Sequence, residues 1–316
     1  MRKKIRNYEH VEGRVYDHKL AIKTVQNTDS ENYGKEFIGG SIDVATDEDC
    51  LNIITVNFTY VTEKTAKNNT NATFTALKNI ITSGKTIVAN GKDEATKVKI
   101  DTALALNDFY SSKGGEETLV SAKRNEGGFV TIVSNLDVEE KRNTFEFDML
   151  INGTKLVEAD EEKHIDADYL IIKGAIFNFR GAILPVELTV KNPNGIKYFE
   201  SLDISQSNML FTRVWGKINS ETIKTVKEEE STFGASKVTE YARSIKEWVV
   251  MGSSPNTYEI GDEEEGITLD ELKAKIAERE VYLADVKKRQ DEYQASKNAP
   301  SVAKAGVSAV QGGFNF

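Results

Sequence analysis

The sequence predicts a mainly β protein with two antiparallel β-domains and one long C-terminal helix. Up to about residue 255 the chain is a succession of short stretches rich in β-branched and aromatic residues, separated by polar turns. From residue 268 it changes to a helical period of apolar residues, which no Gly or Pro interrupts before Pro300. Many short strands with polar turns and few helices are typical of antiparallel barrels and sandwiches.

In the first half, apolar and polar residues alternate as they do in half-buried strands. The alternation predicts strands over residues 10–24, 36–46, 51–61, 85–89, 96–110, 118–123 and 129–133. Residues 124–128 contain two glycines and are expected to form a loop. One helix is predicted over residues 74–82, because Phe74, Leu77 and Ile80 recur at helical spacing and a glycine follows.

The second half starts with a clearly alternating stretch at residues 143–158. Further strands are predicted over residues 169–179, 182–191, 209–218, 221–230 and 238–250. Residues 192–195, Asn-Pro-Asn-Gly, are typical of a turn, since Pro suits its second position and Asn-Gly tolerates positive φ. Residues 196–202 are then expected to return as a partner strand.

The C-terminal helix is predicted over residues 269–296. Thr268 and Glu271 have the spacing of a capping box, in which the two side chains satisfy backbone amides at the helix start. An apolar stripe runs along the helix and consists of Leu269, Leu272, Ile276, Leu283, Val286 and Tyr293. A narrow stripe fits docking on the body or against a partner helix, and docking within the chain is the commoner case.

We expect four segments along the chain. A length of 316 residues fits about two domains, and the charged break at residues 138–142 is the expected boundary between them. The segments are a first β-domain (residues 1–138), a second (139–258), an acidic linker with the long helix (259–298) and a flexible tail (299–316). Residues 1–9 are basic and are expected to form a flexible arm.

The sequence leaves open whether the two halves are copies of one duplicated domain. Residues 41–58 align with residues 186–202, with similar strand lengths about one polar turn, and the sequence around Gly13 aligns with that around Gly174. A duplicated domain is one explanation, and two unrelated meanders with common hairpin features are the other. The identity between the halves does not decide between them.

Composition favours a protein of a reducing compartment. Apolar residues make up 39% of the chain, yet no run approaches the roughly 20 apolar residues of a membrane helix. The basic N-terminus is not followed by an apolar segment, so no secretory signal is expected. The single cysteine, Cys50, rules out an internal disulfide. The expected location is the cytoplasm, or the host cytoplasm if the gene belongs to a phage.

The sequence contains no recognisable catalytic or metal-binding motif. The three His and one Cys have none of the spacings of zinc sites, and the acidic clusters lack the spacing of an EF-hand. There is no GxSxG, and the glycine pairs lack the patterns of phosphate-binding loops. We therefore expect no enzyme, no metal and no cofactor.

Aromatic and basic residues interleave on one strand in particular. In residues 211–218, a period of two puts Arg213, Trp215 and Lys217 on the same face. Rings stack on bases and cations follow phosphates, so such a strand suits single-stranded nucleic acid. The alternative is that Trp215 belongs to the core and that the cations are solvated.

Weaker combinations of the same kind occur on other predicted strands and loops of both halves. The candidate nucleic-acid-binding residues are Arg14, Tyr16, Lys35, Phe37, Lys123, Arg124, Phe179, Arg180, Tyr198, Arg213, Trp215 and Lys217. Each alone is more often packing or ordinary surface, but their recurrence in both halves strengthens the joint case. The net charge of −9 counts against an indiscriminate polyanion binder and still allows a local basic groove.

The order of elements in the first half is found in a known family. A first strand contains Gly (residues 11–15), a second begins Lys-Glu-Phe (35–45), a third is apolar (52–61), and a short helix (74–81) precedes the remaining strands. This order resembles single-stranded DNA-binding proteins with oligonucleotide/oligosaccharide-binding (OB) barrels, of the kind that phages and mobile elements encode. The resemblance implies two OB-like barrels over most of residues 8–255.

The C-terminal end is similar in part to bacterial single-stranded DNA-binding proteins, whose flexible tails end in acidic residues and a Pro-Phe pair. Here the tail ends in Phe316 and lacks both the acidic residues and the Pro. The resemblance implies partners in replication or recombination, reached through the helix or the tail.

The leading prediction is a non-enzymatic, sequence-tolerant single-stranded DNA-binding protein of DNA replication or recombination. Binding would use aromatic stacking and a basic groove. The alternative is a structural or assembly protein such as a phage virion component, and a third option is a carbohydrate- or peptide-binding module. The oligomeric state, the site size and the choice between DNA and RNA stay open.

Overall fold

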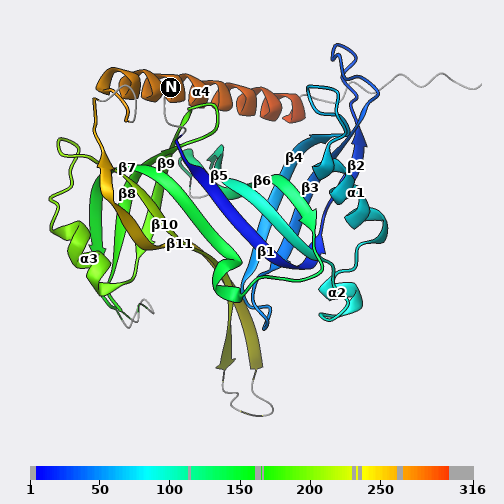
Figure 1. Cartoon of the computed structure of the whole chain (residues 1–316), viewed down its shortest axis with the longest axis horizontal. Helices are drawn as coiled ribbons and strands as arrows, with labels where there is room; N and C mark the ends of the chain where they lie inside the picture. The colour runs from blue at the N-terminus through cyan, green and yellow to red at the C-terminus, as the bar shows by residue number, and fades with distance from the viewer. Residues whose placement is uncertain are drawn as a thin grey trace, which may run out of the picture.

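The protein is mainly β, with a large antiparallel sheet system and a long C-terminal helix, as the sequence predicts (Figure 1). The computed structural model describes residues 5–112, 115–160, 165, 167–229, 233, 237–261 and 266–298. The predicted flexible tail, the first four residues and the acidic run at residues 262–265 lie outside this part. Among the described helices, none has a segment long and apolar enough to cross a membrane.

The first half of the chain closes into a five-stranded barrel. Its strands are β1 (Asn7–His18), β3 (Glu36–Ala45), β4 (Ile53–Thr62), β5 (Lys97–Ser111) and β6 (Thr118–Ile132), and they pair in the order β1-β3-β4-β6-β5-β1. The β4–β6 pairing is parallel and the others are antiparallel. Helix α1 (Ala72–Ser83) lies between the third and fourth strands, and the short β2 (Ala21–Thr24) extends the sheet beside β3. This connectivity is that of an OB barrel.

The second half repeats the topology. Its strands are β7 (Asn143–Val157), β8 (Tyr169–Phe177), β9 (Ile183–Val190), β10 (Leu210–Glu229) and β11 (Lys237–Tyr258), paired in the order β7-β8-β9-β11-β10-β7. The parallel pair again joins the third strand to the fifth, and α3 (Pro193–Glu200) again separates the third from the fourth. The two halves therefore share one fold in the same chain order.

The alignment of the halves that the sequence suggested is wrong in its details. Residues 41–58 form two strands, whereas residues 186–202 form the end of β9 and helix α3. The predicted turn at residues 192–195 and the strand after it are helix, because Asn192 caps the amides of Asn194 and Gly195 and Pro193 occupies the first turn. Phe199 of this helix is buried in the core.

One predicted loop is a strand, and one predicted strand is a helix. Residues 124–128 are not a loop but the middle of β6, where a side chain at Gly127 would lie 2.2 Å from the Phe58 ring. The glycine therefore lets β6 pass close to β4. Residues 87–90 form α2 (Ile87–Asn90) rather than a strand, with Thr86 as its cap. The short helix η1 (Glu139–Lys141) lies between β6 and β7.

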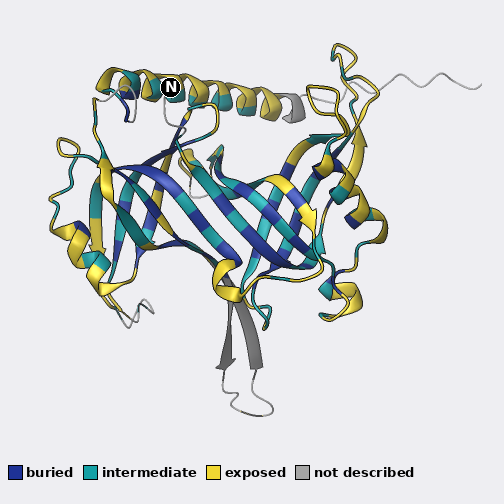
Figure 2. Ribbon diagram, viewed as in Figure 1, coloured by how far each residue is buried: buried dark blue, intermediate teal, exposed yellow. Residues whose placement is uncertain are grey.

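The barrels are joined through their first strands. Strands β1 and β7 pair antiparallel from Asn7 opposite Phe147 to Val11 opposite Asn143, so one sheet runs through both barrels. Buried residues line the inner faces of these strands (Figure 2), and one hydrophobic cluster includes Val11 and Ile100 of the first barrel and Phe145 and Leu170 of the second. The junction is thus part of the core.

Helix α4 (Leu269–Asn298) crosses both barrels along one side of the molecule (Figure 1). Its predicted capping box is present, since the Glu271 amide donates to Thr268 Oγ1 (3.1 Å) and the Thr268 amide donates to Glu271 Oε2 (3.2 Å). Of the predicted stripe, Leu272 is buried in a second apolar cluster, whereas Ile276 is exposed. The helix therefore docks within the chain, with apolar contact mainly at its first turns.

Candidate nucleic-acid interface

Two adjoining recesses form a groove between the barrels. One, of about 440 Å³, lies between β6 of the first barrel and β8–β9 of the second. The other, of about 150 Å³, lies between β4 and β6 on one side and β10–β11 on the other. Lys123 lines both recesses. We call this surface the inter-barrel groove; its polar lining includes Thr55, Asn57, Ser121, Lys123, Arg124, Asn125, Lys173, Glu187 and Lys246.

Lys123 links the barrels at the centre of the groove. Its Nζ lies 4.8 Å from the centroid of the Trp248 ring and donates to the Glu187 carbonyl at 2.8 Å. Burial lowers the pKa of Lys123. A cation in this position is held in place before any ligand arrives, and an anion beside it would offset its lost hydration.

Trp248 is buried, and its ring nitrogen binds the carboxyl group of Glu9. Its Nε1 donates to Glu9 Oε1 at 2.7 Å, and Thr102 Oγ1 donates to Glu9 Oε2 at 2.7 Å. Burial raises the pKa of Glu9 from 4.5 to about 7. Glu9, Trp248 and Lys123 thus form a connected column from the β1–β5 pair through β11 to the groove surface.

The remaining cations of the groove are more exposed. Lys173 pairs with Glu187 at 2.8 Å and Arg124 with Glu126 at 3.0 Å. Lys246 is exposed and has no ion pair within the described part of the chain. The Lys173–Glu187 pair is exposed to solvent, and such pairs contribute little to stability, so Lys173 can exchange its carboxylate for a phosphate.

An aromatic pair lies on the first barrel, on β3 and on β4, the latter of which also lines the groove. The rings of Phe37 on β3 and Tyr60 on β4 lie 4.7 Å apart, and Tyr60 is 46% exposed. Both lie on the outer face because the register shifts between Ile38 and Gly40, which leaves Thr59 and Tyr60 exposed in succession. Strict alternation along β4 puts Tyr60 on the same face as the buried Phe58, so the sequence pattern does not identify it as exposed. The glycine pair Gly39-Gly40, which permits the bulge, is the feature of the sequence that could have indicated its exposure.

A family model named YorF matches residues 9–294 of the chain. The chain belongs to the YorF family. The match covers both barrels and most of α4.

Two solved structures of the single-stranded DNA binding protein from Thermus aquaticus are similar to this YorF-family chain. The wild-type protein is 9% identical, with a TM-score of 0.45 over 82% of this chain and 97% of that chain. A deletion mutant is 10% identical, with a TM-score of 0.45 over 83% and 99%. No curated protein sequence matches.

The predicted residues on β10 reach the surface of this YorF-family barrel, but Arg213 and Lys217 are already hydrogen-bonded within the chain. Arg213 donates to both oxygens of Asp148 (2.7 and 3.1 Å), a hydrogen bond that raises the pKa of the guanidinium. Lys217 donates to Asn143 Oδ1 (2.8 Å) and to the Glu140 carbonyl, and burial lowers its pKa. Trp215 is 42% exposed and packs over Gly252, so it is not the core tryptophan. These three residues line neither recess of the groove.

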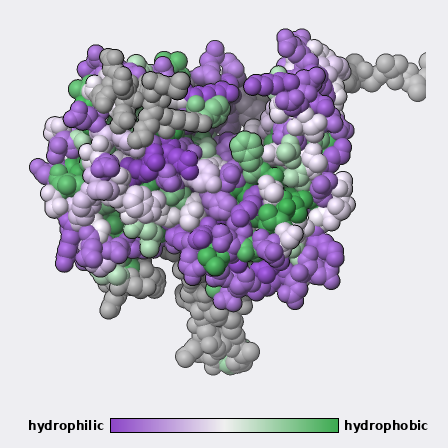
Figure 3. Space-filling model, in the orientation of Figure 1, coloured by the Kyte–Doolittle hydropathy of each residue, from purple (hydrophilic) through white to green (hydrophobic). Residues whose placement is uncertain are grey.

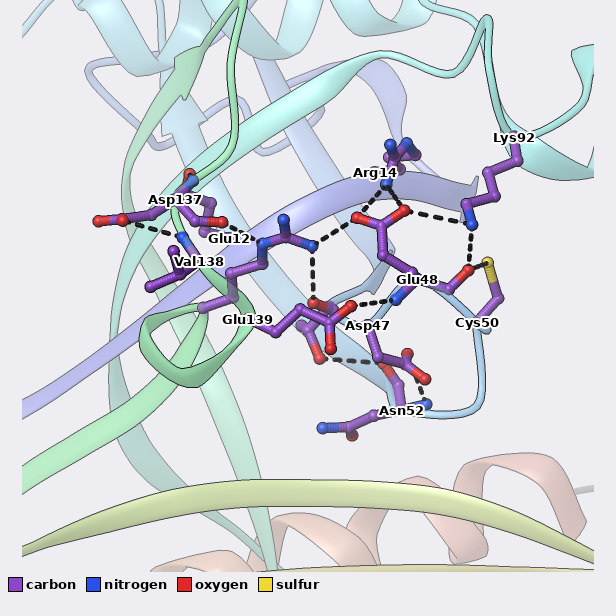
Figure 4. A network of polar contacts seen from close by, with 12 residues as sticks. Glu12, Arg14, Asp47, Glu48, Cys50, Asn52, Lys92, Asp137, Val138 and Glu139 are labelled. Carbon is purple, nitrogen blue, oxygen red and sulfur yellow. Dashed lines mark hydrogen bonds and ion pairs between the residues drawn. The ribbon is translucent and has the colours of Figure 1, made fainter.

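Arg14 belongs to a polar network at the β3–β4 turn (Figure 4). Its Nη1 donates to both oxygens of Glu48, which also accepts from Arg142 and is paired with Lys92. The hydrogen bonds from Arg142 and Arg14 lower the pKa of Glu48 to about 2. Figure 4 shows Glu139 reaching the Glu48 amide, so the network joins the first barrel to the segment before β7. Arg14 is thus bound to Glu48 within the fold.

The other predicted residues are spread over the molecule. Tyr16 is half-buried on β1, and Lys35 is exposed before β3 with its Nζ on Asn32 Oδ1 (3.0 Å). Tyr198 lies on α3, with its ring edge-on to Phe199. Phe179 is 85% exposed in the β8–β9 turn, with Arg180 above its ring. Of the predicted residues, the groove therefore brings together Lys123 and Arg124. Phe37 lies outside it on β3, beside Tyr60 of β4.

No cluster of three or more His, Cys, Asp or Glu side chains suited to a metal ion occurs among the residues that the structure describes.

Proposed function

We propose that this chain binds single-stranded DNA, with little sequence preference, in the inter-barrel groove. The observation that carries the proposal is the position of the groove: it is lined by β4 of one OB barrel and by β8–β9 of the other. β4 is the third strand of the first barrel, and β8 and β9 are the second and third strands of the second barrel. In OB-folds, strands 2 and 3 form the face that binds oligonucleotides. The groove thus brings strands of both barrels together around the half-buried Lys123.

The groove has the chemistry that a single strand needs. Lys123, Lys173 and Lys246 supply cations for phosphates, and Asn57 supplies an amide for base edges. The exposed Tyr60, with the half-buried Phe37 beside it, supplies an aromatic pair for stacking. We propose a role in DNA replication or recombination, in which other proteins reach the complex through the C-terminal region.

An assembly role is the second candidate, and one surface feature favours it. Figure 3 shows hydrophobic surface gathered over the first barrel, on the right of the view. On this barrel Phe129 is 74% exposed and Ile132 is 42% exposed, and Val130 and Ile132 line an open hollow of about 560 Å³ beside α1. Exposed apolar surface of this kind often marks protein contacts.

Fluorescence anisotropy with labelled oligo-dT tests the DNA-binding proposal. We expect the wild-type chain to bind, with an affinity that falls as the salt concentration rises. Lys123→Gln should weaken binding and lower the slope of log affinity against log salt by roughly 0.7 for each phosphate that the variant no longer neutralises. Lys67→Gln, in an exposed loop outside the groove, is the matched control and should bind like the wild type.

Lys123→Gln also removes the cation over the Trp248 ring, so its melting temperature has to be measured alongside. A folded Lys123→Gln variant with unchanged affinity and salt slope would remove the groove from the proposal. A wild-type chain that binds no oligonucleotide at low salt would overturn DNA binding and leave assembly as the leading function.

A further inference from the structure

A third recess, of about 330 Å³, lies where α4 meets both barrels. Leu106 of β5 and Ile183 and Leu184 of β9 form an apolar floor, while Tyr282 of α4 and Arg180 of the β8–β9 turn line it as well. We call it the α4 recess. Its volume is at the lower end of the range for ligand pockets, which suits a group of about nucleotide size.

An ion pair and hydrogen bonds hold α4 over this recess. Arg279 Nη2 contacts Asp108 Oδ1 at 2.9 Å, and the Asp108 side chain is only 2% exposed. Lys275 Nζ donates to the Gly181 carbonyl at 2.6 Å, and Gln290 Nε2 donates to the Tyr110 carbonyl at 2.6 Å. Arg279 and Lys275 are therefore occupied in fixing the helix.

Arg180 differs from these two cations. In the described part of the chain its guanidinium has no ion pair, and it lies 5.2 Å from the centroid of the exposed Phe179 ring. Tyr282, across the recess, is 44% exposed. The recess thus offers an aromatic ring and an aliphatic floor beside an available positive charge.

The α4 recess adjoins the inter-barrel groove. Ser121, which lines the groove, donates to Asp108 of the recess at 2.5 Å. Leu184 of the recess is next in sequence to Pro185 of the groove. Both surfaces therefore include residues of β9, and a strand that follows the groove past Lys173 runs toward the recess.

We propose that the α4 recess binds one nucleotide at the end of the single strand in the groove, with its base against Tyr282 and its phosphate at Arg180. The inference rests on the proposed function and gives α4 a direct part in it. Because α4 supplies Tyr282, the helix is a wall of the binding site as well as a strap between the barrels.

The test measures the affinity of oligo-dT of stepwise increasing length for the full chain and for Arg180→Gln and Tyr282→Ala. Short oligomers that fill only the groove should bind all three alike. At the length where the wild type gains affinity by reaching the recess, Tyr282→Ala should lose about 5- to 150-fold, the effect of one stacked base. Arg180→Gln should lower the salt slope by roughly 0.7 at that length only.

Lys273→Gln and Val281→Ala, on the exposed face of α4, are the matched controls and should behave as the wild type at every length. Variants that bind long oligomers as tightly as the wild type would overturn the recess as a site. Equal losses at all lengths would do the same, since the effect would then not belong to the end of the strand. A wild-type chain that binds no oligomer would instead refute the proposed function itself, and melting temperatures of the variants separate lost binding from lost folding.

Discussion

Glu9 is a carboxyl group that the fold keeps neutral up to about neutral pH. It is fully buried, its two hydrogen-bond donors are the uncharged Thr102 and Trp248, and burial raises its pKa from 4.5 to about 7. Below pH 4.5 both the folded and the unfolded chain carry the proton. Between pH 4.5 and 7 the unfolded chain releases it while the folded chain keeps it, so stability falls as the pH rises through this window.

Glu9→Gln should remove this pH dependence. The amide keeps the volume and can accept from Trp248, but it carries no proton that titrates. The wild type should lose about 3 kcal/mol of unfolding free energy from Glu9 between pH 4.5 and 7, and the variant should lack this loss. Urea unfolding at pH 5 and pH 8, followed by tryptophan fluorescence, measures the difference. An identical pH dependence in both proteins would mean that Glu9 is ionised in the fold.

Cations on strands show what sequence can and cannot reveal about the site. Alternation predicted that Arg213 and Arg14 would reach the surface, and both do so in part. Their partners, Asp148 and Glu48, are 65 and 34 residues away, and nothing in the sequence pattern specifies these contacts. Lys123 was a candidate on similar grounds, but its position on Trp248 depends on the packing of the second barrel against the first.

At the scale of elements, β10 allows a direct test of the predicted aromatic site. Trp215→Ala should leave the fold intact, because a side chain that is 42% exposed does not carry the roughly 3–5 kcal/mol of a core tryptophan. If a base stacks on the ring, as the sequence pattern predicts, oligo-dT affinity should fall by about 1–3 kcal/mol. Melting temperature and affinity are measured on the same sample, with Phe129→Ala as an exposed aromatic control. Unchanged affinity in the folded variant would exclude Trp215 and restrict the site to the groove.

Helix α3 illustrates a limit of local sequence rules. Asn-Pro-Asn-Gly satisfies the rules for a turn, and Asn-Pro equally satisfies those for a helix start. Tertiary packing favours the helix, since Phe199 of the helical residues 193–200 is buried in the core. The long helix α4 was predictable because its cap and its uninterrupted period agree with each other.

At the scale of the whole molecule, the shared core makes the two barrels one thermodynamic unit. Val11, Ile100, Phe145 and Leu170 belong to a single buried cluster, and β1 pairs directly with β7. We therefore expect one cooperative unfolding transition rather than one for each barrel. Differential scanning calorimetry should give a calorimetric enthalpy equal to the van't Hoff enthalpy. Two resolved transitions would show that the barrels unfold independently.

The fold class could be predicted from strand density, whereas the relation of the halves could not. Each barrel closes through a short parallel pairing, such as Val56 with Asn125 in the first and Val250 with Val190 in the second. Pairings so short and so distant in sequence leave no periodic signal. Gly40 packs against a carbonyl just after β1, and Gly174 packs against a carbonyl of β7. These two glycines are therefore the better anchors for comparing the halves.

The antiparallel pairing of β1 with β7 has a consequence for the direction of a bound strand. The first strands of the two barrels run in opposite directions, so the second barrel is inverted relative to the first along their shared sheet. Reversing the 5′ and 3′ ends of an oligonucleotide in the groove would then mainly exchange the two barrels' roles. Helix α4 breaks this equivalence, because Arg279 and Gln290 bind the β5–β6 hairpin of the first barrel, whereas Leu272 packs in the apolar cluster of the second barrel. Any preference for one polarity of the strand should therefore originate from α4.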